Sequence, residues 1–177
     1  FKQINDTLGH AAGDAMLVHV SQVLKQTLNA GDFAARIGGD EFVVAASTDV
    51  SEAGLAKLAE RIITQMRQPT TFEGHECRCG VSIGIASEAG IAVDPAQLLV
   101  NADIALYRAK NRGRNRFEFF TEALQAEVIR TKQVADAILK GLERAEFLPY
   151  YQPLFDAHTL EIVGVEALAR WRHPTLG

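Results

Sequence analysis

The residues best suited to chemistry form a short acidic stretch, Gly38-Gly39-Asp40-Glu41, which lies between two apolar runs. A glycine lets the backbone come close to a phosphate group because it carries no side chain. Carboxylate oxygens suit Mg²⁺, which usually binds one or two protein carboxylates and keeps several waters or substrate phosphates. By itself the pattern fits two structures, a metal-dependent phosphate site and an acidic turn that is merely solvated.

Two cations, Lys110 and Arg114, lie where a later segment is expected to end a helix at Gly113. Cations pair with phosphate oxygens, and an arginine can do so through two parallel hydrogen bonds. Cations are also favoured at any helix C-terminus by the helix dipole. Their position is therefore compatible with a phosphate site but does not by itself indicate one.

Apolar periodicity predicts the elements that must position these residues. Helices are expected at 13–28, 51–66 and 94–113, and strands at 33–37, 42–46, 77–86 and 116–120. The paired glycines at 38 and 39 supply the positive φ that a tight hairpin turn requires, which places the acids at its tip. A hairpin among alternating helices and strands favours an α+β fold, with an antiparallel or mixed sheet flanked by helices in a ferredoxin-like or polymerase-palm arrangement.

A longer helix is expected over residues 121–145, where apolar residues alternate at spacings of four and three along a heptad seam. This helix either pairs with its twin in a second copy or packs on its own domain, and the periodicity fits both arrangements. Two strands are expected after it, at 147–155 and 160–168, around a turn at 156–159.

Composition narrows the class of protein. With 18 Lys and Arg against 22 Asp and Glu, the 177 residues carry a net charge of -4, which gives no general attraction to nucleic acid or to an anionic membrane. No apolar run reaches the roughly 20 residues of a membrane span, and the chain opens on Phe1 without a signal sequence, so we expect a soluble piece cut at its start. Cys77 and Cys79 are expected as reduced cytoplasmic thiols on one strand face, with a two-residue metal hook as the alternative.

Three separated motifs together resemble the GGDEF diguanylate cyclase family over essentially all of residues 1–120. The motifs are FKxxNDxxGHxxGD at residues 1–14, RIGGDEF at residues 36–42 and ADxALYxAKxxGRN at residues 102–115. The resemblance implies that two such domains face each other as a homodimer, each with one bound GTP, and join the two nucleotides into cyclic di-GMP. It also implies Mg²⁺ as the cofactor, with Mn²⁺ as a substitute.

The family pattern assigns substrate binding to residues of three separate segments. Asn5 and Asp14 would bind the guanine edge, since an amide and a carboxylate match its donors and acceptor. The full set of implied substrate-binding residues is Asn5, Asp14, Leu17, Gly38, Gly39, Lys110 and Arg114. Among these, Leu17 would lie beside the base, the two glycines would approach the phosphates, and the two cations would neutralise the β- and γ-phosphates.

The family pattern also implies which residues take part in the reaction. Asp40, Glu41 and Lys2 occupy the implied catalytic positions, and the two carboxylates would also be ligands of the metal. Metal would lower the pKa of the attacking 3′-hydroxyl and screen the α-phosphate, and positioning would do the remainder.

Two departures from the family pattern bear on activity. The family carries a further metal-binding aspartate on a strand that would lie before Phe1, so the piece is expected to bind Mg²⁺ poorly. Many members also have an Arg-x-x-Asp product-inhibition site, and the corresponding residues here run from Asn29 to Asp32. Because Asn29 lacks the forked guanidinium that recognises phosphate or guanine, weak or absent product inhibition is expected.

The C-terminal segment resembles the opening of the EAL family of cyclic di-GMP phosphodiesterases, which normally form a TIM-type barrel. The resemblance depends on YYQP at residues 150–153 and GVEALARW at residues 164–171. It implies that Glu166 is a metal ligand and that Gln152, Leu168 and Arg170 contact cyclic di-GMP. Roughly 30 residues cannot form a barrel of ~250 residues, so this piece alone is not expected to hydrolyse anything.

The sequence is thus divided into a GGDEF domain at 1–120 that lacks its first strand, a linker helix at 121–145 and an EAL fragment at 146–177. The expected function is that of a diguanylate cyclase in a bacterial cytoplasmic protein that also carries a phosphodiesterase domain, with any membrane anchor upstream of this segment. The fragment itself is expected to be inactive. The alternatives are a catalytically silent GTP-sensing module that regulates the EAL phosphodiesterase, and a purely structural dimerisation unit.

Overall fold

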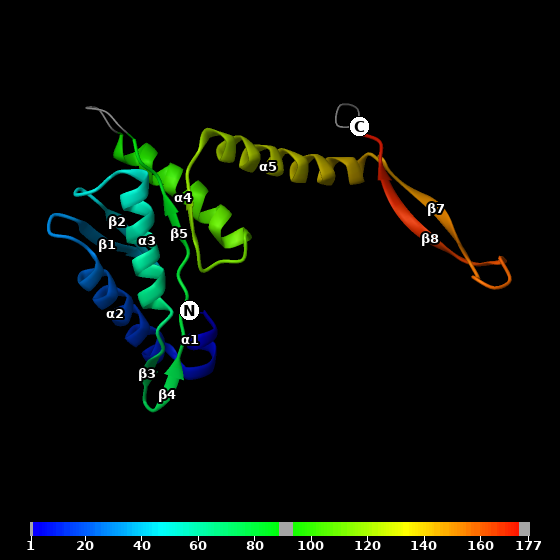
Figure 1. Cartoon of the computed structure of the whole chain (residues 1–177). Coiled ribbons are helices and arrows are strands. Elements are labelled where there is room, and N and C mark those ends of the chain that lie inside the picture. Colours follow the sequence, from blue (N-terminus) through cyan, green and yellow to red (C-terminus); the bar gives the residue numbers. More distant parts are fainter. Residues whose placement is uncertain (1, 89–93, 174–177) are drawn as a thin grey trace. The chain divides into compact units, whose positions relative to one another are not determined.

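A computed structural model describes residues 2–88 and 94–173, with side chains from residue 4 onward (Figure 1). The chain divides into two compact units, residues 1–125 and 126–177. The elements of the first unit are α1 (Lys2–Leu8), α2 (His10–Thr27), β1 (Phe33–Gly38), β2 (Glu41–Ala45), α3 (Glu52–Met66), β3 (Thr70–Phe72), β4 (His75–Cys77), β5 (Ile83–Ile85), α4 (Pro95–Asn111) and β6 (Phe117–Phe119). Helix α5 (Glu122–Glu143) begins in the first unit and continues into the second, which ends with β7 (Phe147–Phe155) and β8 (Ile162–Trp171).

The core of the first unit lies between α2 and α3. Val23 and Leu24 of α2 pack with Leu58, Ile62 and Met66 of α3, and all five side chains are buried. Apolar side chains of the β1–β2 hairpin and of β5 pack against the same cluster. Burying a side chain of this size is worth roughly 1.5–3 kcal/mol, so this cluster fixes where the hairpin and β5 lie.

Local signals predict the starts of α3 and α4 correctly. The Ser51 hydroxyl accepts a hydrogen bond from the Gly54 amide at 3.1 Å and caps α3. The Asp94 carboxylate accepts one from the Ala96 amide at 2.9 Å, and Pro95 occupies the first turn of α4. Helix α2 begins three residues before the expected position, and the short helix α1 was not predicted at all.

The α+β class is confirmed, but the single sheet is wrong for the part of the chain that the structure describes. The strands form four separate pairs: β1–β2, β3–β4 and β7–β8 are antiparallel, and β5–β6 is parallel. The strand expected over 77–86 is also too long, because Cys77 pairs with Thr70 in the β3–β4 hairpin and only Ile83–Ile85 pair with β6. Alternating side chains predict a strand, but a strand forms only where a partner backbone is available.

Helix α4 lies directly against β5 because Gly84 has no side chain. A Cβ at this position would collide with the backbone of α4 at Ala102 and Leu106. Ala105 and Ala109, on the same helix, are fully buried. This close packing fixes the C-terminal end of α4, which carries the predicted phosphate-binding cations.

The second unit contains the end of α5 and the β7–β8 hairpin. Trp171 stacks on Phe147 with ring centroids 5.2 Å apart, and its indole N–H donates to the Glu146 carboxylate at 3.0 Å. The turn is built by Asp156, whose carboxylate accepts from two following amides at 2.8 Å. Among the helices of the described residues, none combines the length and apolar character that crossing a bilayer requires.

Candidate functional site

The β1–β2 hairpin presents the predicted acids at an open tip. The register changes between Arg36 and Gly38, so that Gly38 pairs with Glu41 and leaves Gly39 and Asp40 as the turn. Gly39 has a left-handed φ of 50°, and the Arg36 guanidinium donates to its carbonyl at 2.9 Å. A Cβ on either glycine would meet no atom within 4 Å. Packing within the described chain therefore does not require Gly38, whereas the turn itself requires Gly39.

Helices α1 and α2 bring Asn5 against Gly13. A Cβ at Gly13 would coincide with the Asn5 amide oxygen, so this glycine makes room for the asparagine side chain. The Asn5 Oδ1 atom is buried and has no hydrogen-bond partner within the described residues. An unpaired buried acceptor costs roughly 1–3 kcal/mol, which a ligand donor would recover. The role of Gly13 in seating Asn5 could not be derived from sequence spacing.

The other predicted residues of these helices differ in exposure. Asp14 follows Gly13 on α2 and is exposed, whereas Leu17, one turn further, is 7% exposed. The backbone of Lys2 lies in α1, but its side chain is outside the part that the structure describes.

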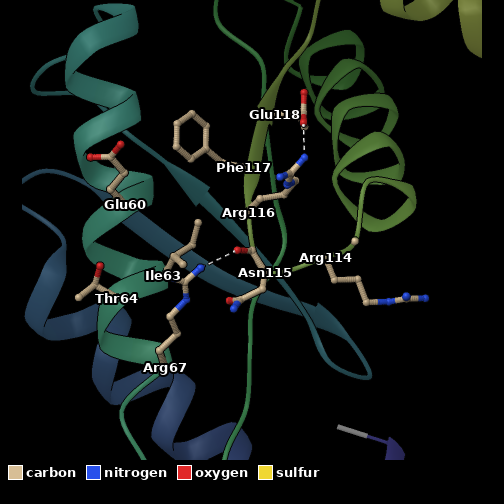
Figure 2. Close-up of a pocket in the computed structure, with 10 residues that line it drawn as sticks. Glu60, Ile63, Thr64, Arg67, Arg114, Asn115, Arg116, Phe117 and Glu118 are labelled. Carbon is tan, nitrogen blue, oxygen red and sulfur yellow. Dashed lines mark hydrogen bonds and ion pairs between the residues drawn. The ribbon is translucent and has the colours of Figure 1, made fainter.

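The predicted cations lie at and after the end of α4. Lys110 is in the last turn, and the helix is followed by three left-handed residues, Gly113, Arg114 and Asn115, with φ values of 103°, 61° and 53°. Figure 2 shows the Arg114 side chain pointing away from the neighbouring Arg67 and Asn115. Within the described residues, the Arg114 guanidinium makes no hydrogen bond or ion pair.

The loop after α4 packs at Gly80, and the charge of Asp40 acts on the neighbouring residue Cys79. Burial raises the pKa of the Cys79 thiol, and the negative charge of Asp40 raises it further. The Asn115 side chain packs on Gly80, where an added Cβ would lie 3.2 Å from its amide group. The loop that carries Arg114 therefore lies next to the thiol on which the charge of Asp40 acts.

Metal binding would depend on the two hairpin carboxylates. Across residues 2–88 and 94–173, no group of three or more His, Cys, Asp or Glu side chains converges. Asp40 and Glu41 still fit Mg²⁺, because this ion commonly takes one or two carboxylates and completes its shell with waters and phosphates. Cys77 and Cys79 are free thiols, and no third ligand joins them within these ranges.

Two hollows lie on the first unit, and one of them includes Arg114. A groove of about 800 Å³ runs between α3 and the start of β6 and is lined by Arg67, Asn115 and Glu118 among others (Figure 2). A hollow of about 420 Å³ lies beside α2 and β1 and includes Asn29 and Asp32. Neither is lined by Asn5 or by the acids of the hairpin tip. Of the predicted nucleotide-binding residues, Arg114 lines the first hollow, whereas Asn5 and the glycines of the hairpin line neither one.

Both carboxylate oxygens of Asp32 accept hydrogen bonds from other residues of the chain. One carboxylate oxygen accepts from the Asn29 backbone and side chain at 2.9 and 3.2 Å, and the other accepts from Ser47 and Thr48 at 2.9 and 3.1 Å. These hydrogen bonds, that from the Ser47 amide foremost, lower the pKa of Asp32 to about 2. In the segment that corresponds to the product-inhibition motif, Asp32 therefore closes its own loop at Asn29 and ties it to Ser47 and Thr48.

The predicted cyclic di-GMP residues of the second unit share one face of the β7–β8 hairpin. Gln152 lies directly opposite Glu166, and Tyr150 lies opposite Leu168. Side chains two residues apart on a strand point to the same face, so Arg170 lies on it as well. The Arg170 guanidinium lies 5.9 Å from the centroid of the Tyr150 ring.

Comparison with known proteins adds an independent finding. Residues 1–116 match the family model described as "Diguanylate cyclase, GGDEF domain", and residues 135–177 give a short match to the "EAL domain" model. The whole chain is 38% identical to the bifunctional diguanylate cyclase/cyclic di-GMP phosphodiesterase MucR of Pseudomonas aeruginosa, and it covers 26% of that protein. The chain spans about a quarter of the length of the curated relatives it matches.

Two solved structures resemble the first unit. The GGDEF domain of PA1120 from Pseudomonas aeruginosa is 37% identical with a TM-score of 0.68, over 72% of this chain and 74% of that one. The coiled coil and GGDEF domain of DgcB from Caulobacter crescentus, solved in complex with c-di-GMP, is 29% identical with a TM-score of 0.59, over 67% and 63% of the two chains.

Proposed function

Because this chain belongs to the GGDEF diguanylate cyclase family, we propose that its first unit condenses GTP into cyclic di-GMP in a protein that also carries an EAL phosphodiesterase domain. The unpaired acceptor on Asn5 is the observation that carries the proposal. Guanine offers a ring N–H and an amino group as donors, and the buried amide oxygen of Asn5, which has no partner, would accept from the amino group. Asp14 would accept from the ring N–H, and Leu17 would lie beside the base.

The hairpin tip supports the phosphate half of the proposal. Gly38 has open space where a side chain would project, so the backbone can approach a phosphate group there. Lys110 and Arg114 would neutralise the β- and γ-phosphates. Arg114 suits this task because its guanidinium makes no ion pair or hydrogen bond within the described chain.

Asp40 and Glu41 would hold Mg²⁺, or Mn²⁺ in its place. The bound ion supplies charge screening at the α-phosphate and lowers the pKa of the attacking hydroxyl. Glu41 would also help to position that hydroxyl, and Lys2 would add a catalytic cation.

The reaction needs two copies of the first unit. The 3′-hydroxyl of each GTP attacks the α-phosphorus of the other and gives up its proton to solvent, a new P–O bond forms, and the bond to the leaving pyrophosphate breaks. Two such steps close the ring and release two pyrophosphates. Since each copy of the first unit would hold one nucleotide, the two copies must face each other in a homodimer, which the exposed apolar residues Ile138 and Leu142 of the α5 seam would support.

In the second unit we propose the opening of the EAL domain, with its TIM-type barrel completed by residues outside this chain. Glu166 would be a metal ligand, and Gln152, Leu168 and Arg170 would contact cyclic di-GMP. Their shared hairpin face supports this grouping.

The test compares GTP with ITP, whose base lacks the amino group of guanine. The complete protein is incubated with each nucleotide and Mg²⁺, and cyclic dinucleotide is measured by chromatography. We expect cyclic di-GMP from GTP and a rate with ITP lower by about tenfold, because one buried acceptor loses its donor. Asn5→Ala should remove most of this preference, and Asn101→Ala, whose amide instead bonds Gln97 on α4, should keep it.

Other outcomes separate the alternatives. Binding of GTP without any product would favour the silent sensory module. No binding of GTP at all would refute the proposal. An unchanged preference for GTP in Asn5→Ala would remove the role assigned to that residue.

A further inference from the structure

The loop that follows α4 is more constrained than a helix end requires. One left-handed glycine, Gly113, is enough to end a helix, and the Arg114 amide completes this cap by donating to the Ala109 carbonyl at 3.0 Å. Arg114 and Asn115 are nevertheless left-handed as well. Residues other than glycine and asparagine rarely adopt this conformation, so the left-handed Arg114 in particular indicates that more than the cap holds the loop.

Asn115 is held from two distant elements. The backbone N–H of Asn115 donates to the hydroxyl of Ser82, which lies just before β5, at 3.2 Å. Its carbonyl accepts from the Arg67 guanidinium at 3.1 Å, at the C-terminal end of α3 (Figure 2). Its side chain is packed on Gly80. The backbone of Asn115 is therefore fixed against both the helix layer and the β5 segment.

Two other arginines of this loop, Arg112 and Arg116, are held by the Glu118 carboxylate. Arg112 and Arg116 approach the Glu118 carboxylate at 3.4 and 3.7 Å. Within the described part of residues 112–116, Arg114 alone among the three arginines has no side-chain partner. Contacts thus hold Arg112, Asn115 and Arg116 around Arg114, whose own guanidinium stays available.

We propose that Arg67 and Ser82 are positioning residues, which hold Asn115 so that Arg114 is presented to the terminal phosphates of the nucleotide. The inference rests on the proposed function and extends it to two residues that contact no nucleotide themselves. Arg67 and Arg114 both line the groove between α3 and β6, but the Arg114 side chain extends away from Arg67 (Figure 2). Within the described residues, Arg67 and Ser82 bond the backbone of Asn115 and not Arg114, so their effect on Arg114 passes through that backbone.

A double-mutant cycle in the complete protein tests this inference. The probes are GMP and a GTP analogue whose α,β-bridging oxygen is a methylene group, so that no turnover occurs. Arg67→Met and Ser82→Ala should each weaken binding of the analogue by about threefold or more and leave binding of GMP unchanged. In an Arg114→Ala background, neither change should weaken the analogue further, because the group that they position is gone.

Two controls separate positioning from general structure. Arg61→Met removes another guanidinium of α3, which donates to the Thr27 carbonyl at the same distance of 3.1 Å, and it should change neither affinity. Arg67→Lys retains a donor for the Asn115 carbonyl and should recover part of the lost affinity. If Arg67→Met fails to fold by circular dichroism, Ser82→Ala still completes the cycle.

Each result decides between the two levels of inference. Equal weakening of GMP and the analogue, or losses that persist in the Arg114→Ala background, would overturn the positioning role while cyclic di-GMP synthesis by the wild type leaves the proposed function intact. If the wild-type protein binds neither probe and makes no cyclic di-GMP, the proposed function fails and this inference fails with it.

Discussion

Gly38→Ala should distinguish the effect of this glycine on stability from its effect on catalysis. The added Cβ would meet no atom within 4 Å, and Gly38 is not among the left-handed residues of the chain. Replacing glycine by alanine inside a strand removes an entropic penalty of roughly 0.5–1 kcal/mol. The variant should therefore be as stable as the wild type or more stable, with a Tm higher by up to about 2–4 °C.

The same methyl group should be harmful to catalysis. If the Gly38 backbone approaches a phosphate group, the Cβ occupies that approach and displaces the triphosphate by about 1 Å, which costs on the order of 100-fold in rate. The assay is the initial rate of cyclic di-GMP synthesis, measured beside thermal unfolding on the same preparation.

Gly39→Ala is the contrasting variant. Its φ of 50° makes a side chain there cost roughly 1–2 kcal/mol, so a loss of activity could arise from the turn alone. A near-normal rate in Gly38→Ala at unchanged Tm would refute the phosphate approach. A clear loss of stability would refute the open space inferred at this position.

Three further perturbations follow from contacts described above. Gly13→Ala should displace the Asn5 side chain, which lowers the affinity for GTP, measured by calorimetric titration. It should also lower the free energy of unfolding in urea by about 1–3 kcal/mol. An unchanged affinity would contradict the role of Gly13 in seating Asn5. Gly84→Ala should lower the free energy of unfolding by about 3 kcal/mol or more because its Cβ meets backbone rather than a movable side chain, and a loss below about 1 kcal/mol in urea would show that α4 can shift freely. Asp32 has a folded pKa of about 2 against an ordinary value of 3.8, so its stabilising contribution is present above pH 3.8 and is lost as the pH falls toward 2. Asp32→Asn should make the free energy of unfolding less dependent on pH in this range. A pH dependence identical to that of the wild type would show that the hydrogen bonds of Asp32 contribute nothing to stability.

The features predicted correctly from the sequence are those that short-range chemistry determines. The caps at Ser51 and Asp94 and the glycine turn at the hairpin need only neighbouring residues, and all three lie where they were expected. Helix α1 was missed because seven residues, KQINDTL, are too few to establish an apolar period. The β3–β4 hairpin was missed although its turn carries a signal, Gly74 with a φ of 82°.

The contacts that shape the candidate site are long-range and could not be derived from spacing. Asn115 bonds residues 33 and 48 positions away, Ser82 and Arg67, and nothing in the local sequence of either marks it as a partner. The extent of β5 was misjudged for the same reason, because strand pairing depends on the backbone that packing brings alongside. The family resemblance located the reactive residues, and the three-dimensional contacts indicate which neighbours hold them.

The chain contains a single tryptophan, and Trp171 lies where α5 meets the β7–β8 hairpin in the second unit. When the excitation wavelength is chosen so that tyrosine does not absorb, the fluorescence of Trp171 therefore reports on this junction and carries no signal from the first unit. Far-ultraviolet dichroism, in contrast, reports on every helix, and most of the helical residues lie in α2, α3 and α4 of the first unit, with α5 as the main contribution from the second. Following both signals through one denaturant titration gives an internal optical measure of whether the two units melt together or in turn.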